Sequence, residues 1–232
     1  MPPKPRVVIL CPEQCDIFLS IYAEQLDNLE EKLEIHTADT AEQVRRYINS
    51  TVRPQAIIVA DAFVTVPSYR DVLLRLVDYA RIGGTVIYAG LLSSFSTSST
   101  LNAAFEHMWK LPWRTGPYHR KTVELNTAVK GINTKLALKK YSQKALSLAN
   151  VELPHAVYLE PAKTRRVETG PHGRTVYETP AAFAPIGQGF FGYIGDVNGE
   201  AGTIKLLLAM CLRHGARTPA TVGTGVPPTV CQ

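Results

Sequence analysis

Short apolar runs alternate with amphipathic segments over the first 92 residues, and this alternation limits the fold more than any other feature. Runs such as QAIIVAD at 55–61 are apolar on both faces, which is typical of strands buried on both sides. Between the runs, apolar residues recur at helical spacing, as in Val72, Leu76 and Ala80. We therefore predict strands at 6–11, 34–38, 55–61 and 85–92 and helices at 16–33, 39–50 and 68–84.

Buried strands joined by helices form a parallel sheet with helices on both faces. Right-handed crossovers then give a three-layer, flavodoxin-like α/β fold whose sheet is mostly parallel. In such sheets, ligands bind beyond the carboxyl ends of the strands. Four segments are predicted to lie there: Cys11–Cys15, Asp61–Thr65, Gly90–Ser99 and Asp196–Glu200.

The alternation of apolar runs and amphipathic segments ends after residue 92. We predict a helix at 133–149, later strands at 155–160, 174–186 and 189–196, and a closing helix at 199–215. The expected organisation is one domain over 1–215, with an aromatic and basic elaboration at 93–174. Residues 216–232 are rich in Pro, Thr and Gly and are expected to form a loose tail.

Charge is unevenly distributed along the chain. Residues 109–174 carry 13 Lys and Arg against 4 Asp and Glu, a net charge of +9, whereas residues 1–108 carry a net charge of −4. Such a segment suits either a solvated lysine-rich face or an anionic partner. The four cysteines form no CxxC pair, and no secretory leader or membrane-spanning run is visible, so we expect a cytoplasmic protein with reduced thiols.

Four segments together resemble the class I glutamine amidotransferase-like superfamily, most closely its ThuA-like subset. They are RVVILC at 6–11, AIIVADAF at 56–63, LLRLVDYARIGGTVIYAG at 73–90, and GQGFFGYIGDVNGE at 187–200 with the helix after it. In active members, the resemblance implies a nucleophilic cysteine on the sharp turn after the strand equivalent to TVIYAG at 85–90. In those members, a histidine partner lies later in the chain, and the N–H groups of a glycine-rich turn form the oxyanion site.

The chain departs from this pattern at both places. The turn reads Ala89-Gly90-Leu91-Leu92 and holds no cysteine, and the expected oxyanion turn reads Ala60-Asp61-Ala62. Thioester chemistry needs a thiolate and aligned N–H donors. The first hypothesis is therefore a noncatalytic amidotransferase-like domain that binds a small ligand, such as an anion, or forms a homo-oligomer.

A second hypothesis is a hydrolase with a displaced catalytic centre. Ser93 and Ser94 lie just beyond the turn, and His107 and His119 are candidate bases, although no GxSxG motif is present. Cys15 is a candidate thiol, because a position near a helix N-terminus lowers a thiol pKa. We name Ser94, His119 and Cys15 as catalytic candidates; the alternative is that the hydroxyls cap a helix and the thiols are inert.

Candidate ligand-binding residues fall into three groups. The first lies at predicted strand ends, and the second combines aromatic and cationic side chains that could hold an anionic or aromatic ligand or could pack as a lid. The third consists of side chains with hydrogen-bond acceptors at alternate positions before the last helix. These side chains would either bind a ligand or cap that helix. In order, the groups are Asp61, Tyr88, Gly90 and Ser93; Trp113, Arg114 and Arg120; and Asp196 and Asn198.

No motif predicts a cofactor or a metal site. Dinucleotide, P-loop and zincin patterns are missing, as are the remaining ligands of a calcium loop around Asp196. No RNP, KH or zinc-finger pattern appears, so nucleic acid is not the expected partner, and a membrane is not expected either. The basic segment leaves a third hypothesis, an adaptor for an acidic partner or nucleic acid.

Overall fold

The computed structural model describes residues 3–51 and 53–213 and contains a six-stranded, mostly parallel sheet. The strand order is β10-β11-β4-β3-β1-β2, and only β10 runs antiparallel to its neighbour. The predicted parallel α/β sheet is thus confirmed. Its strands are β1 (Arg6–Leu10), β2 (Glu34–Ala38), β3 (Ala56–Val59), β4 (Thr85–Tyr88), β10 (Ala181–Ile186) and β11 (Gly189–Ile194).

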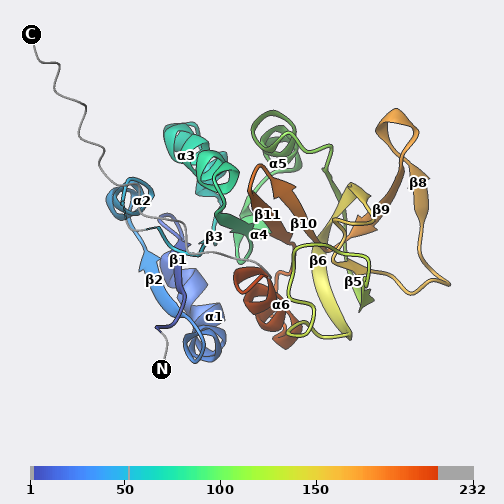
Figure 1. Cartoon of the computed structure of the whole chain (residues 1–232), viewed down its shortest axis with the longest axis horizontal. Coiled ribbons are helices and arrows are strands. Elements are labelled where there is room, and N and C mark those ends of the chain that lie inside the picture. The colour runs from blue at the N-terminus through green and yellow to red at the C-terminus, as the bar shows by residue number, and fades with distance from the viewer. Residues whose placement is uncertain (1–2, 52, 214–232) are drawn as a thin grey trace, which may run out of the picture.

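Helices cover both faces of this sheet (Figure 1). One core contains buried side chains of α1 and α6, and the other contains those of α2 and α3. Each helix buries an apolar stripe and turns its charged residues outward, which is why the sheet can be apolar on both sides. The bounds are α1 (Cys15–Glu30), α2 (Ala41–Ile48), α3 (Arg70–Arg81) and α6 (Ala201–Cys211).

A second sheet, which the sequence did not predict, occupies the elaboration (Figure 1, right). Its five strands are all antiparallel to their neighbours, in the order β7-β5-β6-β9-β8. They are β5 (Arg114–Leu125), β6 (Lys140–Glu152), β7 (Tyr158–Leu159), β8 (Val167–Thr169) and β9 (Thr175–Thr179). The chain reaches this sheet through α4 (Leu92–Phe95), α5 (Ser98–Ala103) and a π-helix, η3 (Ala104–Trp109).

The predicted helix at 133–149 is wrong, because most of that segment forms β6. Gln143, Ala145 and Ser147 are all buried, and the residues between them are more exposed, which is the period of a strand. Leu138, Tyr141, Ala145 and Leu148 happen to fit a helical spacing as well. Pairing with β5 decides the outcome, since strand formation depends on cross-strand neighbours more than on local propensity.

Aromatic side chains fill the core where η3 and the start of β5 meet the sheet. The Trp109 and Phe191 rings stack with centroids 4.0 Å apart, and Tyr88 meets Phe191 edge-on at 4.8 Å. Phe105 and Trp113 complete the cluster. The Trp109 indole N–H donates to the Tyr88 hydroxyl at 3.2 Å, so the buried polar atoms of both residues are satisfied.

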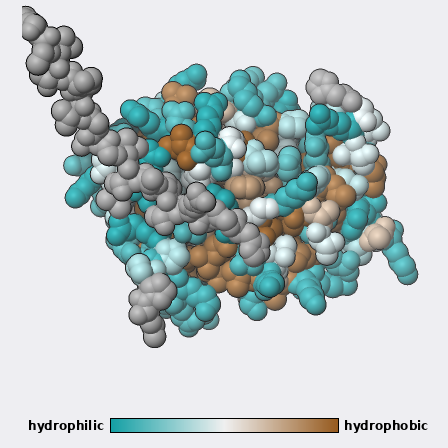
Figure 2. Space-filling model, viewed as in Figure 1, coloured by the Kyte–Doolittle hydropathy of each residue, from teal (hydrophilic) through white to brown (hydrophobic). Residues whose placement is uncertain are grey.

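Figure 2 shows hydrophobic side chains near the middle of one face, over α6, and hydrophilic side chains around the rim. Among the described residues, no helix has the length and apolar character needed to cross a membrane. The predicted tail at 216–232 lies outside the described residues.

Candidate functional site

The turn after β4 is built on Gly90, which has a φ of +62°. A Cβ there would lie 2.9 Å from the Ala60 carbonyl oxygen and 3.1 Å from the Phe18 ring. The same carbonyl accepts a hydrogen bond from the Leu91 N–H at 2.7 Å, so it is fixed in place. A side chain at position 90 of this turn would therefore displace the backbone after β3 or the Phe18 ring.

Asp61 occupies the point where the strand order reverses, between β1 and β3. Its side chain is fully buried and accepts hydrogen bonds from the N–H groups of Glu13 at 2.9 Å, Gln14 at 3.2 Å and Phe63 at 3.0 Å. Burial raises the pKa of Asp61, and these hydrogen bonds oppose that rise. N–H groups that could hold an anionic ligand at such a point are thus occupied by the chain's own carboxyl group.

The thiols beside Asp61 are not activated. Burial, followed by the nearby Asp39 and Asp16, raises the pKa of Cys15, which is the opposite of the lowering proposed for a helix N-terminus. Burial and Asp61 raise the pKa of Cys11 above its ordinary range, and burial raises that of Cys211 to about 12. The physical reason is that nearby carboxylates and desolvation outweigh the helix dipole.

The displaced hydrolase candidates lie in different parts of the molecule. Ser94 is exposed, and Ser93 is buried and donates to the Gly195 carbonyl at 3.4 Å. His107 lines a cavity between α3 and α5, whereas His119 lies in the second sheet. Within the described part of the chain, no hydrogen bond joins Ser94, Cys15 and His119 into a catalytic group.

Most aromatic and cationic candidates serve the fold. Tyr88 and Trp113 are buried in the aromatic core, so their rings present no face to a ligand. The Arg114 guanidinium pairs with Glu106 at 2.6 Å, and that of Arg120 pairs with Glu200 at 2.8 Å. Both guanidinium groups are therefore already paired with carboxylates.

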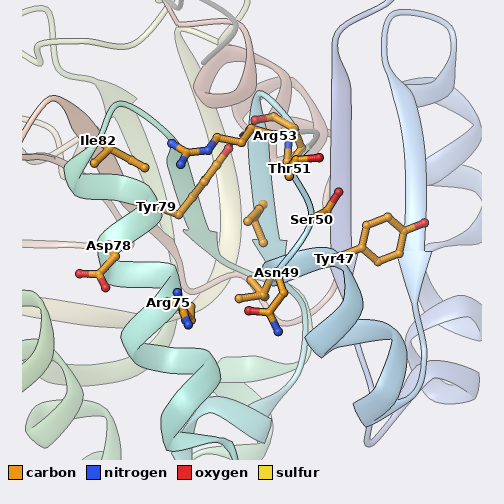
Figure 3. A pocket seen from close by; sticks show the side chains of 12 residues that line it. Tyr47, Asn49, Ser50, Thr51, Arg53, Arg75, Asp78, Tyr79 and Ile82 are labelled. Carbon is orange, nitrogen blue, oxygen red and sulfur yellow. Dashed lines mark hydrogen bonds between the residues drawn. The ribbon is translucent and has the colours of Figure 1, made fainter. Parts of the chain in front are cut away.

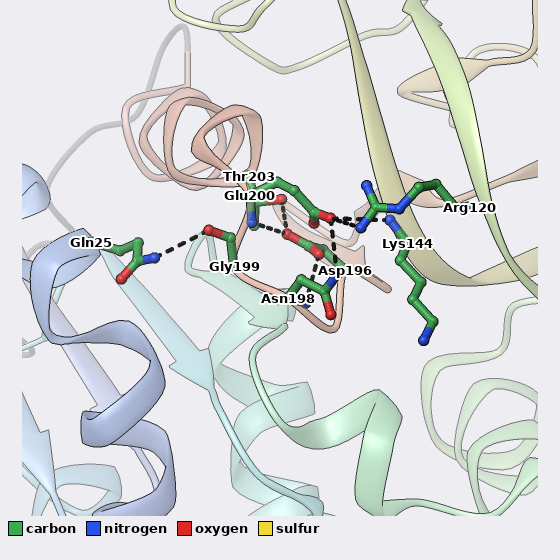
Figure 4. A network of polar contacts seen from close by, with 8 residues as sticks. All are labelled: Gln25, Arg120, Lys144, Asp196, Asn198, Gly199, Glu200 and Thr203. Carbon is green, nitrogen blue, oxygen red and sulfur yellow. Dashed lines mark hydrogen bonds and ion pairs between the residues drawn. The ribbon is translucent and has the colours of Figure 1, made fainter.

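Asp196, Asn198 and Glu200 form the polar network in Figure 4. Asp196 accepts hydrogen bonds from the Asn198 N–H at 3.0 Å, the Glu200 N–H at 2.9 Å and the Thr203 hydroxyl. These contacts hold the turn that leads into α6. The N-cap residue of α6 is Glu200, which makes no side-chain capping hydrogen bond, so Asp196 stabilises the turn before the helix and does not occupy the cap position. Asn198 is exposed, and its side-chain amide donates to Glu200 at 3.3 Å.

The pKa values of the two carboxyl groups in this network shift in opposite directions. Burial, and then the hydrogen bond to Glu200, raises the pKa of Asp196 to about 7. Partial burial raises the pKa of Glu200, but hydrogen bonds from Asp196 and Arg120 outweigh it and lower that pKa overall. Burial thus disfavours the charged form of Asp196, whereas the ion pair with Arg120 favours the charged form of Glu200.

The structure adds a cavity of about 400 Å³ between α2 and α3, at the amino end of β3 (Figure 3). Arg53 and Tyr79 lie at one end of it, and Arg75 and Asn49 lie at the other. No hydrogen bond or ion pair to a described residue engages either guanidinium group. The full lining is Tyr47, Ile48, Asn49, Ser50, Thr51, Arg53, Pro54, Ile57, Arg75, Asp78, Tyr79 and Ile82.

A smaller polar pocket lies on the second sheet, around His119. The sequence analysis named His119 but missed the residues that the structure brings to it: Lys121, Gln143, Glu160 and Glu178. They come from β5, β6, β9 and the residue after β7. Because they are far apart in the sequence, they form no short motif from which the pocket could be predicted. The one available signal was the polar residue Gln143 at an inward position of a strand, and that signal was hidden by the helix prediction at 133–149.

Comparison with known proteins supports the fold. No family model matches the sequence, and no curated protein matches it either. Among solved structures, a ThuA-like protein from Bacteroides uniformis ATCC 8492 is 14% identical over 90% of both chains, with a TM-score of 0.50. A ThuA-like protein from Parabacteroides merdae ATCC 43184 is 10% identical over 90% of this chain and 88% of its own, also with a TM-score of 0.50.

This chain has the fold of ThuA-like proteins. The likeness covers both sheets, since it extends over nine-tenths of the chain. The predicted fold-level resemblance is thereby confirmed.

The closed turn at Gly90 gives a first prediction. Gly90→Ala should lower the free energy of unfolding by about 2–4 kcal/mol, because the left-handed backbone is strained and the new Cβ meets a backbone oxygen. Gly173→Ala is the matched control, since Gly173 is also left-handed, with a φ of +71°, but a Cβ there has no neighbour within 4 Å. Urea unfolding measures both; equal losses would show that the turn has room for a side chain.

The raised pKa of Asp196 gives a second prediction. Folding binds a proton at Asp196 between about pH 4, the ordinary value, and about pH 7, so the group makes the folded state less stable as pH rises through that window. Asp196→Asn imitates the protonated acid and removes this loss. The free energy of unfolding of the variant, relative to that of the wild type, should therefore increase as the pH is raised from 4 to 8, as urea titrations would measure.

Asp27→Asn, at an exposed position of α1, serves as the control for that titration. Its stability relative to the wild type should change much less over the same pH range. A gap between Asp196→Asn and the wild type that stays constant with pH would contradict the proposed protonation.

Proposed function

We propose that this chain is a noncatalytic amidotransferase-like domain that binds a small anionic ligand. It would form one domain over 1–215, with the second sheet as an elaboration. The observation that carries the proposal is the turn at Gly90, where the fold keeps its sharp backbone bend and offers no attacking atom. Catalysis of acyl transfer needs a nucleophile held beside N–H donors, and Gly90 cannot supply one.

The surroundings of that turn support the same conclusion. A substitute nucleophile would need a lowered pKa, but burial and carboxyl neighbours raise those of Cys11 and Cys15. Asp61 takes up the N–H groups of Glu13, Gln14 and Phe63 beside them. The carboxyl edge of the sheet is therefore packed with the chain's own hydrogen bonds where an active relative would receive its substrate.

The cavity between α2 and α3 is the better ligand site. Its volume of about 400 Å³ lies within the range of small-molecule sites. Arg53 and Arg75 offer guanidinium donors at its two ends, and such donors bind carboxylates and phosphates in two-point contacts. Asp78 also lines it, but this carboxylate pairs with Arg81 at 3.5 Å, which offsets its negative charge.

A glutamine-analogue electrophile tests the noncatalytic part of the proposal. Incubation of the folded protein with 6-diazo-5-oxonorleucine should give no stoichiometric adduct by intact-mass spectrometry, because none of the three described thiols is activated. Cys15→Ser is the control for adventitious reaction at the partly exposed thiol. Clean labelling of one cysteine that is retained in Cys15→Ser would overturn the proposal.

Anion titration tests the ligand-binding part. Pyrophosphate and citrate are suitable probes in calorimetry at low salt, and we expect at least one of them to bind with an affinity that falls as salt is added. Arg53→Gln together with Arg75→Gln should weaken binding at least about 10-fold, since each charge-assisted hydrogen bond contributes roughly 1.5–3 kcal/mol.

Arg46→Gln is the matched control, because Arg46 is exposed on α2 and does not line the cavity. It removes one positive charge and should leave the affinity nearly unchanged. Equal weakening by Arg46→Gln would indicate a general charge effect. The expected homo-oligomer is a separate part of the hypothesis and stays a prediction.

A further inference from the structure

The pocket around His119 lies on one face of the second sheet. In the register of β5 and β6, His119 is opposite Ala145 and Lys121 is opposite Gln143. Residues at every second position of both strands therefore face the same side. Because these positions are polar and partly or fully buried, this face is unlike an ordinary apolar core.

The sheet curls so that β7 and β9 approach each other over this face. The Thr179 hydroxyl donates to the Tyr158 carbonyl at 2.6 Å and joins the end of β9 to β7. Glu178, at the end of β9, and Glu160, just after β7, are brought together above Lys121. The Lys121 ammonium contacts both carboxylates, at 3.3 Å for Glu178.

Three of these side chains have the geometry of a metal-binding set. One donor atom each from His119, Glu160 and Glu178 lies within 4.8 Å of the others. Donors around a bound transition metal lie roughly 3–4 Å apart, so small side-chain movements would close the set. The His119 Nε2 atom is 3.2 Å from a Glu178 oxygen, yet it is buried and makes no aligned hydrogen bond.

Gln143 supplies an independent reason to expect a ligand. Its side chain is 1% exposed and lines the same pocket, and neither its amide oxygen nor its amide nitrogen has a hydrogen-bond partner. A buried polar group is rarely left without a partner, because its desolvation is not repaid. An oxygen-seeking cation beside the two carboxylates would satisfy the amide oxygen.

The size of the pocket limits what can fill it. Its free volume is about 10 Å³, close to the space of one water molecule. A single ion or a single water fits, and an organic ligand does not. An imidazole with two carboxylates and an amide oxygen forms a mixed nitrogen and oxygen donor set, which suits Mn²⁺ or Zn²⁺.

We propose that His119, Glu160 and Glu178 bind one divalent transition-metal ion, with the Gln143 carbonyl as a further donor. The ion would displace the Lys121 ammonium, whose side chain is 31% exposed and can turn toward solvent. The same two carboxylates thus bind a cation in either state. This site is separate from the cavity between α2 and α3 and does not depend on the proposed anion binding.

Manganese titration of the full-length chain tests the site. Protein treated with EDTA and dialysed should bind one Mn²⁺ per chain by calorimetry, and Mn²⁺ is chosen because thiolates bind it weakly. Electron spin echo spectra should show coupling to one imidazole nitrogen. Glu178→Gln and His119→Asn should each weaken binding at least about 10-fold, as even outer-shell changes have effects of that size.

Lys121→Met distinguishes a metal site from an ion-pair network. If the ammonium competes with the ion, the variant should bind Mn²⁺ more tightly than the wild type. Glu168→Gln, on the exposed face of β8, is the matched control and should bind like the wild type.

Three results would overturn the proposal. The first is that neither the wild type nor Lys121→Met binds Mn²⁺ or Zn²⁺ at about 1 mM. The second is that Mn²⁺ binds but its spectra show no coupling to nitrogen. The third is that Glu178→Gln and Glu168→Gln bind the ion with equal affinity. If Glu178→Gln does not fold, Glu160→Gln replaces it, and the spectra of the wild type still decide.

Discussion

The contact between β6 and the carboxyl end of β11 determines how the two sheets are arranged. The Leu146 N–H donates to the Gly195 carbonyl at 2.9 Å, and the Tyr193 hydroxyl donates to the Leu146 carbonyl at 2.9 Å. A Cβ on Gly195 would lie 2.0 Å from that Leu146 oxygen. The backbones can approach only because residue 195 is glycine, so the second sheet is docked on the parallel sheet by main-chain contacts.

This docking lets the two faces of one hairpin serve different purposes. On one side, Arg120 and the Lys144 N–H bind Glu200, which ties β5 and β6 to the start of α6. On the other side, His119 and Gln143, each next to one of those residues in sequence, face the proposed metal pocket. Neighbouring residues of a strand point to opposite faces, and the network in Figure 4 therefore supports the pocket through the shared backbone.

Sequence reasoning succeeded where local pattern and fold agree. The first four strands and the parallel sheet that they form follow from short periodic patterns in the sequence. It failed at β6, whose partner β5 is about 25 residues away and whose lysines fit a helix equally well. The pocket was lost with it, since Glu160 and Glu178 approach His119 only after the sheet curls.

The ion pairs of the second sheet neutralise part of its positive charge. The net charge of +9 over 109–174 suggested an anionic partner, but several of these cations are paired inside the molecule. Arg120 pairs with Glu200 and Lys121 with Glu160 and Glu178, and all three carboxylates are mostly buried.

A cation that is paired with a carboxylate adds no net charge, so these pairs contribute little to attraction at long range. Glu106, Glu178 and Glu200 lie outside residues 109–174, so their ion pairs offset part of the net charge of that segment.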